Sequence, residues 1–217
     1  MSLSLPSPAA SFPSTAAPAT LLLATDVFGN TPAVAGLVRQ LAVPTLVVSP
    51  FGSKPRSFRS EQEAYQAFLA EGGVAAYAQL LHAALLQQPE LHFAIGFSAG
   101  ASALWLNSPR PVMASLLQTV LFYGSRIRDH RTLQPQSPVR LIFAQQEAAF
   151  DAAELAQDLR ARGHQAELAS GTRHGFMNSY SRGSHIAAQT HYMTQLISLL
   201  QQGKRRFNPR EAHCCTA

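Results

Sequence analysis

The sequence predicts an α/β protein with a mostly parallel sheet flanked by helices on both faces. Short apolar segments alternate with helix-like segments from residue 20 to residue 200. In such sheets, functional groups collect at the carboxyl ends of the strands. Five chemically versatile side chains fall at or just after the ends of predicted strands, in agreement with this rule: Asp26, Ser98, Tyr123, Glu147 and His174.

Each element is predicted from the period of its apolar residues and from residues typical of helix ends. Expected strands cover residues 21–24, 45–48, 91–95, 119–123, 139–143 and 165–169. Expected helices begin at Thr31, cover 60–72, 74–88 and 99–106, and then cover 151–163 and 184–201. Thr31 is an N-cap followed by proline, and Ser60 and Asp151 each precede a glutamate by three residues, as in a capping box. We find no internal repeat and no second domain.

The composition indicates one globular domain with tails. The chain has 217 residues, of which 47% are apolar and 13% charged, and this length suits a single domain. We expect a flexible leader rich in Ser, Pro and Ala at 1–19, the folded domain at 20–202, and a basic tail at 203–217. The tail carries much of the net charge of +5. No interleaving of aromatic and basic residues suggests a base-stacking surface, so we expect no nucleic-acid partner.

Cysteine usage and apolar runs bear on the compartment. The two cysteines, Cys214 and Cys215, are adjacent and cannot build an internal disulfide framework, which favours a reducing, cytoplasmic setting. The leader lacks the features of a secretory signal, and no apolar run is long enough to span a bilayer. No histidine pair has the H-E-x-x-H ligand spacing, so we expect neither a metal nor another cofactor. Monomer and homodimer both remain open.

The segment Gly96-Phe97-Ser98-Ala99-Gly100 is the most informative part of the chain. It matches G-x-S-x-G, in which a serine occupies a sharp turn between a strand and a helix. The two glycines allow the strand and the helix to approach closely. The turn raises the Ser98 hydroxyl above the sheet edge, where a base and a substrate can reach it. This context predicts that Ser98 is a nucleophile.

A serine nucleophile needs a base, and the base needs an orienting acid. Among the eight histidines, His174 follows the last predicted strand and precedes Gly175, which permits a turn that aims the ring inward. The acid should follow the strand that ends at residue 143, where Glu147 and Asp151 compete. We favour Glu147, because Asp151 has a capping role to fill.

An acyl-transfer site also needs amide donors for an oxyanion. The amide of Ala99 should be one donor, and the amide of Val27, in the loop after the first strand, should be the other. In the same loop, Phe28 and Asn30 are expected to line the pocket, although a plain glycine turn with Phe28 in the core fits the residues too. Further residues are expected to contact the substrate: Asp26, Tyr123 and Phe176.

Over most of residues 20–200, the chain resembles the dienelactone hydrolase family of α/β-hydrolases. The resemblance rests on residues 25–29 (TDVFG), 96–100 (GFSAG), 122–124 (FYG), 174–176 (HGF), and 181–182 (SR) followed by a helix at 187–188. It implies an α/β-hydrolase fold without a large lid domain, and hydrolysis of an ester or lactone. The chain order Ser98, Glu147, His174 is the order expected of α/β-hydrolases.

The chain departs from this family at three positions. Ser98 stands where the founding enzymes have cysteine, and Glu147 where aspartate is usual. Asn178 stands near the position of an arginine that binds a substrate carboxylate, a role that only Arg173 or Arg182 could take over nearby. Asp26 resembles a family carboxylate near the resting nucleophile.

These residues predict a metal-free serine hydrolase that cleaves a small-molecule ester or lactone through an acyl-enzyme. The altered acid and the missing arginine leave a second hypothesis, in which the chain is a weakly active or inactive binding protein with a hydrolase fold. A third hypothesis is acyl transfer to an acceptor other than water, which would use the same residues.

Overall fold

A computed structural model describes residues 19–53 and 55–207. The expectations for the leader and for Cys214 and Cys215 fall outside the described residues. The described chain folds around one sheet of six strands in the order β2-β1-β3-β4-β5-β6, and every neighbouring pair is parallel. The strands are β1 (Leu21–Ala24), β2 (Thr45–Val48), β3 (Phe93–Phe97), β4 (Gln118–Phe122), β5 (Val139–Gln146) and β6 (Gln165–Arg173).

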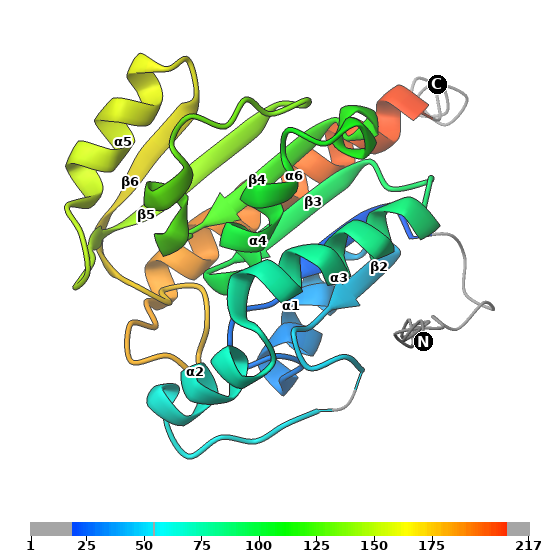
Figure 1. The fold of residues 1–217 in the computed structure, drawn as a ribbon. Helices are drawn as coiled ribbons and strands as arrows, with labels where there is room; N and C mark the ends of the chain where they lie inside the picture. Colours follow the sequence, from blue (N-terminus) through cyan, green and yellow to red (C-terminus); the bar gives the residue numbers. More distant parts are fainter. Residues whose placement is uncertain (1–18, 54, 208–217) are drawn as a thin grey trace, which may run out of the picture.

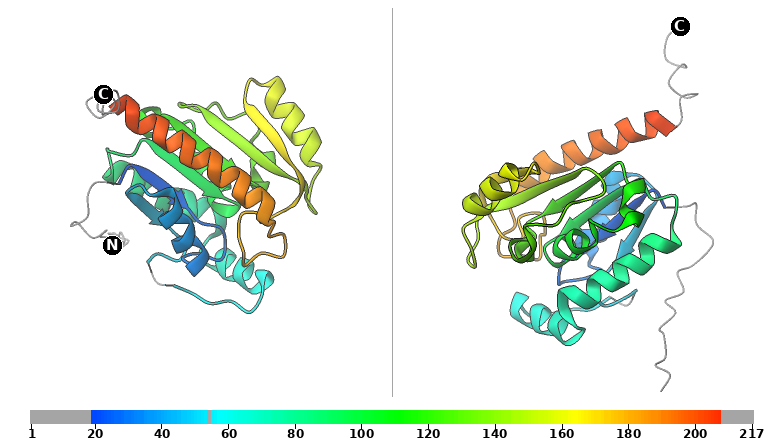
Figure 2. Two further views of the ribbon diagram at one scale, coloured as in Figure 1. Left: turned by 180° about the vertical axis from the view of Figure 1, so that it is seen from behind. Right: turned by 45° about the horizontal axis from the view of Figure 1, so that its top comes forward.

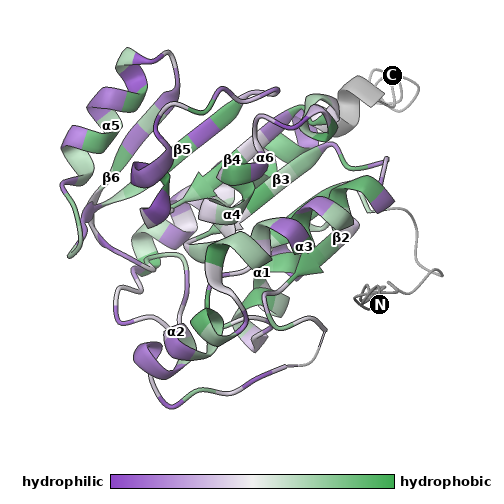
Figure 3. Cartoon of the chain, viewed as in Figure 1, coloured by the Kyte–Doolittle hydropathy of each residue, from purple (hydrophilic) through white to green (hydrophobic). Residues whose placement is uncertain are grey.

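Helices cover both faces of the sheet, which confirms the predicted fold class (Figure 1). Helices α1 and α6 lie together on one face, as the view from behind shows (Figure 2). Helices α3, α4 and α5 pack on the other face, and α2 lies beyond α3 at the rim. The helices are α1 (Pro32–Leu41), α2 (Glu61–Ala70), α3 (Gly73–Gln87), α4 (Ala99–Asn107), α5 (Ala152–Ala161) and α6 (Ile186–Phe207). Apolar colouring concentrates in the central strands and α3 (Figure 3).

Strand β1 shows how the alternation of side chains divides the core into two layers. Successive residues of a strand point to opposite faces of the sheet. Leu22 packs in the cluster that contains α3, α4 and α5, whereas Leu21 and Leu23 pack in the cluster beneath α1 and α6. All three leucines are fully buried. A strand buried on both faces is expected to be continuously apolar, and for this reason the run could be recognised in the sequence.

The predicted N-caps of α1 and α2 are present, whereas α3 begins at Gly73 instead of 74 and α6 at Ile186 instead of 184. The Thr31 hydroxyl accepts a hydrogen bond from the amide of Val34, and the Ser60 hydroxyl accepts one from the amide of Glu63. The Glu63 carboxylate accepts from the amide of Arg59 at 2.7 Å, one residue before the Ser60 amide that a capping box would pair. The two hydroxyls satisfy amides that a helix leaves unpaired at its first turn.

Several element boundaries differ from the prediction. Strand β3 covers 93–97 instead of 91–95, and helix α6 continues to Phe207, past the expected end of the domain at residue 202. Strands β5 and β6 extend to Gln146 and Arg173, beyond their predicted ends at 143 and 169. These extensions are polar and partly exposed, so they lack the apolar run that identifies a buried strand. Two 3₁₀ helices were not predicted, η1 (Pro111–Ser115) and η2 (Ser125–His130).

Within the described part of the chain, no helix alone has both the length and the apolar character to cross a membrane. The bent pair of α2 and α3 meets this criterion only when the two helices, 69° apart, are counted together.

Two glycines let helix α4 begin directly against the sheet. A Cβ on Gly100 would overlap the carbonyl oxygen of Ala24 in β1, and a Cβ on Gly96 would lie 2.7 Å from the Cα of Ala101. Neither contact can relax by moving a flexible side chain, because backbone atoms form the obstacle. The expected reason for glycine at these two positions is therefore confirmed.

We predict that Gly100→Ala destabilises the protein by about 3 kcal/mol, since forcing atoms into a packed core costs roughly that much. The matched control is Gly36→Ala in α1, where the nearest atom to a new Cβ is 3.7 Å away. This control should gain about 0.5–1 kcal/mol from the higher helix propensity of alanine. Urea unfolding of both variants measures the difference, and equal stabilities would contradict the steric account.

Candidate active site

The turn at Ser98 has the backbone conformation of a strained strand-to-helix elbow. Ser98 has φ 49° and ψ −106°, in a region that residues with a Cβ rarely occupy. Its amide donates to the carbonyl of Phe122 in β4 at 2.9 Å, and its carbonyl accepts from the Ser102 hydroxyl at 3.0 Å. These bonds fix the backbone of Ser98 from two sides, so the side chain is held at the carboxyl edge of the sheet.

His174 lies directly after β6 and reaches the Ser98 hydroxyl. The Nε2 atom of His174 is 2.8 Å from Ser98 Oγ, and the chain then turns at Gly175, which has φ 82°. Tyr123 packs edge-on against the imidazole with ring centroids 5.1 Å apart. The structure thus brings together the serine and the histidine that the sequence singles out, although 76 residues separate them.

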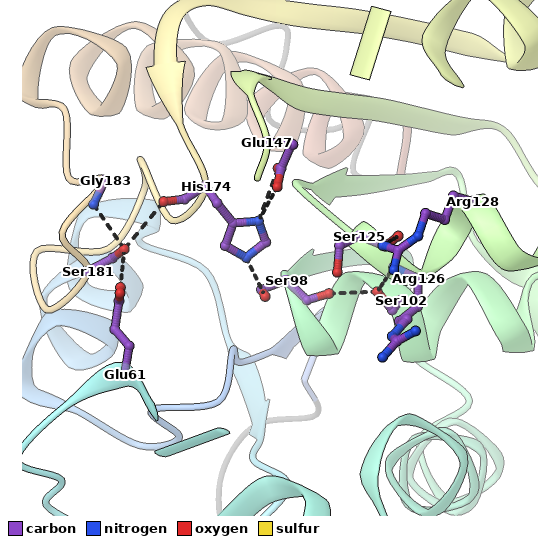
Figure 4. Close-up of polar contacts among 10 residues, drawn as sticks. All are labelled: Glu61, Ser98, Ser102, Ser125, Arg126, Arg128, Glu147, His174, Ser181 and Gly183. Carbon is purple, nitrogen blue, oxygen red and sulfur yellow. Dashed lines mark hydrogen bonds and ion pairs between the residues drawn. The ribbon is translucent and has the colours of Figure 1, made fainter. Parts of the chain in front are cut away.

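Glu147, and not Asp151, contacts the imidazole (Figure 4). The two Glu147 carboxylate oxygens lie 3.0 and 2.9 Å from His174 Nδ1. The Glu147 side chain is 3% exposed, against 38% for His174. Asp151 instead caps α5 by accepting from the amides of Ala153 and Glu154. A carboxylate accepts only, so Nδ1 carries the proton and Nε2 is left free to accept one from Ser98.

The residues of the two expected oxyanion donors line the same cavity as Ser98. Ala99 is the first residue of α4, and Val27 follows β1. Neither amide donates a hydrogen bond to another atom of the described residues. The Val27 loop is shaped by the Asp26 carboxylate, which accepts from the amide of Phe28 at 3.0 Å. Both amides are therefore unpaired within the described residues, and their role as oxyanion donors stays a prediction.

A cavity of about 610 Å³ opens above Ser98. Its far wall is largely apolar and is formed by residues of α2, α3 and α4. These residues are Tyr65, Phe68, Leu69, Val74 and Leu106. Phe28 also lines this cavity while only 7% exposed, so it belongs both to the pocket wall and to the core. A substrate with an apolar group next to a reactive carbon would fit such a wall.

Two expected pocket residues lie elsewhere. Phe176 is fully buried and packs edge-on against Phe122 on the α6 side of the sheet, because the turn at Gly175 directs the chain into the core. Asn30 does not line the cavity, and its amide donates to the carbonyl of Gly52. Tyr123 does line it, fully buried beneath the imidazole.

Asp26 lines the cavity, as expected, and pairs with Asn178. Asn178 donates to the second oxygen of Asp26 at 2.6 Å, so Asn178 is occupied and does not replace a substrate-binding arginine. Neither Arg173 nor Arg182 lines the cavity; the arginine that does so is Arg126. Burial raises the pKa of Asp26 above its ordinary value, against the lowering effects of the Asn178 and Phe28 hydrogen bonds.

Three further residues of the site were not found by sequence reasoning. The Ser102 hydroxyl donates to the carbonyl of Ser98. Arg126 donates to the hydroxyl of Tyr65 at 3.4 Å, and Glu61 accepts from the Ser181 hydroxyl. Arg126 and Glu61 make contacts between segments that are distant in the sequence, which no local pattern reveals, whereas Ser102 contacts Ser98 from only four residues away. Among the described residues, no group of three His, Cys, Asp or Glu side chains could hold a metal ion.

Comparison with known proteins supports the fold and gives little beyond it. No family model matches the chain. A curated relative, the uncharacterised protein YczH of Bacillus subtilis strain 168, is 34% identical over 109 residues. This match covers 50% of the chain and 52% of YczH, so the chain spans about half the length of the curated relative it matches.

Solved structures with a similar fold include three hydrolases or candidate hydrolases. A candidate dienelactone hydrolase of Klebsiella pneumoniae has a TM-score of 0.66 at 15% identity, covering 85% of this chain and 88% of that one. A dienelactone hydrolase-like promiscuous phosphotriesterase from metagenomic libraries has 0.60 at 19%, covering 84% and 85%. Esterase PE8 has 0.50 at 17%, covering 86% and 93%. The chain therefore has the α/β-hydrolase fold, and the expected likeness to dienelactone hydrolases is confirmed for the fold.

We predict that Asp26 gives the protein a stability that falls as the pH rises. Its folded-state pKa is raised by burial from an ordinary value of 3.8, so the unfolded chain ionises first. The contribution is complete below pH 3.8 and is lost as the pH passes through the raised pKa. The free energy of unfolding, measured between pH 4 and 8, should therefore decline for wild type relative to Asp26→Asn. Parallel curves for the two proteins would contradict this assignment.

Proposed function

We propose that this protein is a serine hydrolase that cleaves a carboxylic ester or lactone through an acyl-enzyme intermediate. The observation that carries the proposal is the continuous chain of contacts from Ser98 Oγ to His174 Nε2, at 2.8 Å, and from His174 Nδ1 to the Glu147 carboxylate, at 2.9 Å. A nucleophile, a base and an orienting acid in this geometry are the parts that acyl transfer needs.

Acylation follows from the positions of these atoms. Ser98 Oγ attacks the carbonyl carbon while His174 Nε2 takes the hydroxyl proton, and Glu147 stabilises the imidazolium that forms. The carbonyl oxygen becomes an oxyanion between the amides of Val27 and Ala99. When the intermediate collapses, the bond from the carbonyl carbon to the leaving oxygen breaks, and His174 gives its proton to that oxygen. The alcohol, or the opened end of a lactone, is released from the carbonyl.

Deacylation uses the same groups with water as the nucleophile. Water attacks the acyl carbon, His174 accepts a proton from it, and the bond to Ser98 Oγ breaks as that oxygen is protonated again. The carboxylic acid leaves, and the resting state is restored. The 38% exposure of the His174 side chain supports water as the acyl acceptor, because a transferase must keep water away from its acyl-enzyme.

The apolar wall of the cavity supports an uncharged, apolar group on one side of the reactive carbonyl. Tyr65, Phe68 and Leu69 supply this surface from α2. Burying apolar area contributes roughly 25 cal/mol per Å², so a few methylene groups against this wall give useful binding energy. Short p-nitrophenyl esters are suitable test substrates for this reason.

We predict that Ser98→Ala abolishes turnover of p-nitrophenyl butyrate, with a loss of about 10⁴-fold or more in kcat/KM. The physical reason is that no other group can form the acyl-enzyme. Ser115→Ala, on the exposed helix η1, is the matched control and should retain wild-type turnover. Circular dichroism verifies that both variants are folded. Wild-type turnover in a folded Ser98→Ala protein would refute the proposal.

We predict that Glu147→Gln lowers kcat/KM by about 10³-fold or more, because an amide no longer holds the imidazole in the productive tautomer or stabilises its charged form. Asp151→Asn removes the same charge from the competing acid and should leave kcat/KM unchanged. It should also leave stability nearly unchanged, since asparagine caps helices about as well as aspartate. Steady-state kinetics of the two variants decide between the acids, and the reverse pattern would assign the role to Asp151.

A further inference from the structure

Helix α2 presents one face to the catalytic cavity. Glu61, Tyr65, Phe68 and Leu69 all line the cavity, and their spacing of four, three and one residues places them on one side of a helix. Tyr65 and Leu69 are 38% and 45% exposed, which is unusual for apolar side chains that serve only the core. The apolar stripe of α2 is therefore a wall of the site as well as a packing surface.

Glu61, the first residue of α2, makes a polar contact instead. The Glu61 carboxylate accepts a hydrogen bond from the Ser181 hydroxyl at 2.6 Å (Figure 4). It accepts another from the Arg182 amide at 3.1 Å. Both donors belong to the loop that follows His174. Hydrogen bonds to a charged acceptor are about twice as strong as neutral ones, so Glu61 ties α2 firmly to this loop.

Ser181 transmits this contact to the backbone of His174. Its hydroxyl oxygen accepts from the amide of Gly183 at 3.1 Å and lies 3.3 Å from the carbonyl oxygen of His174. A Cβ on Gly175 would overlap the Ser181 hydroxyl, and a Cβ on Gly183 would overlap the His174 carbonyl. No free space separates Ser181 from the turn that carries the imidazole, so a displacement of one moves the other.

The rest of α2 is held less firmly. Ala64 and Phe68 are the buried residues of this helix, and the helix is followed by Gly72 and Gly73, which have φ 92° and 62°. The contact between Arg126 and the Tyr65 hydroxyl is long, at 3.4 Å. The Glu61 bonds are thus the shortest polar link between the described part of α2 and the loop that carries the base.

We propose that Glu61 is a positioning residue that acts through Ser181 to hold His174 against Ser98. The inference rests on the proposed function. Because the same face of α2 carries Tyr65 and Leu69, this helix joins the binding of an apolar substrate group to the placement of the base. Glu61 contacts no reacting atom, and its effect is on the chemical step through the position of the imidazole.

The kinetic test compares Glu61→Ala with Glu63→Ala. Glu63 lies in the same first turn and accepts from the Arg59 amide, but it does not contact the loop, so its loss weakens the helix start alone. Glu61→Ala should lower kcat for p-nitrophenyl butyrate about tenfold or more with KM within about twofold, since small misplacements of catalytic groups carry large costs. Glu63→Ala should keep kcat within about twofold of wild type.

Two further variants separate positioning from charge. Glu61→Gln keeps an oxygen that accepts from Ser181 and should retain kcat within about threefold of wild type. Ser181→Ala should cause most of the loss seen in Glu61→Ala, since only the longer bond from the Arg182 amide remains, and the double variant should lose little more than Glu61→Ala. An equal loss in Glu61→Gln and Glu61→Ala, or additive losses in the double variant, would overturn the proposed route through Ser181.

Hydrogen exchange gives a readout that does not depend on activity. Exchange in residues 174–183 should rise in Glu61→Ala and stay unchanged in Glu63→Ala. If wild type hydrolyses the ester and Ser98→Ala does not, unchanged kcat and exchange in Glu61→Ala overturn the positioning role alone. If wild type has no activity, the proposed function fails, and raised exchange in Glu61→Ala still supports the hold of Glu61 on the loop.

Discussion

The close approach of helix α4 to strand β1 is the constraint on which the rest of the site depends. Gly100 lies so near the Ala24 carbonyl that no side chain fits between them. The chain must therefore pass from β3 into α4 within a single turn, and Ser98 takes up the required positive φ. That turn places Ser98 and Ala99 in the lining of one cavity, and the amide of Ala99 has no partner among the described residues. The strained backbone of Ser98 and the placement of the proposed nucleophile and oxyanion donor thus have one steric origin.

The other half of the site depends on the pairing of β5 with β6. These strands remain paired after an irregularity between Ala144 and Gln146, and their last pair joins Gln146 to Arg173. Glu147 and His174 directly follow this last pair, so the pairing of β5 with β6 places the carboxylate and the imidazole side by side. The loop after His174 is then held from α2 by Glu61. The turn at Ser98, the ends of β5 and β6, and the start of α2 consequently meet above the carboxyl edge of the sheet.

Local patterns in the sequence predict much of this arrangement, and contacts between distant segments account for the remainder. The apolar strands, the helix caps and the turn at Ser98 each have a signature within a few residues. The competing roles of Glu147 and Asp151 could be weighed because a cap is also a local pattern. By contrast, Phe176 lies two residues after the imidazole and yet enters the core, and the partner of Glu61 is 120 residues away. No period or spacing encodes these outcomes.

The central claim is that Ser98 is the activated nucleophile of the site. The most direct measurement is incubation of the folded protein with a fluorophosphonate, which modifies an activated serine, followed by mass spectrometry of its peptides. The account predicts the mass of one phosphonyl group on the peptide that contains Ser98 and on no other peptide, because His174 and Glu147 activate that hydroxyl alone. An unmodified Ser98 in the folded protein, or modification at a different serine, would contradict it.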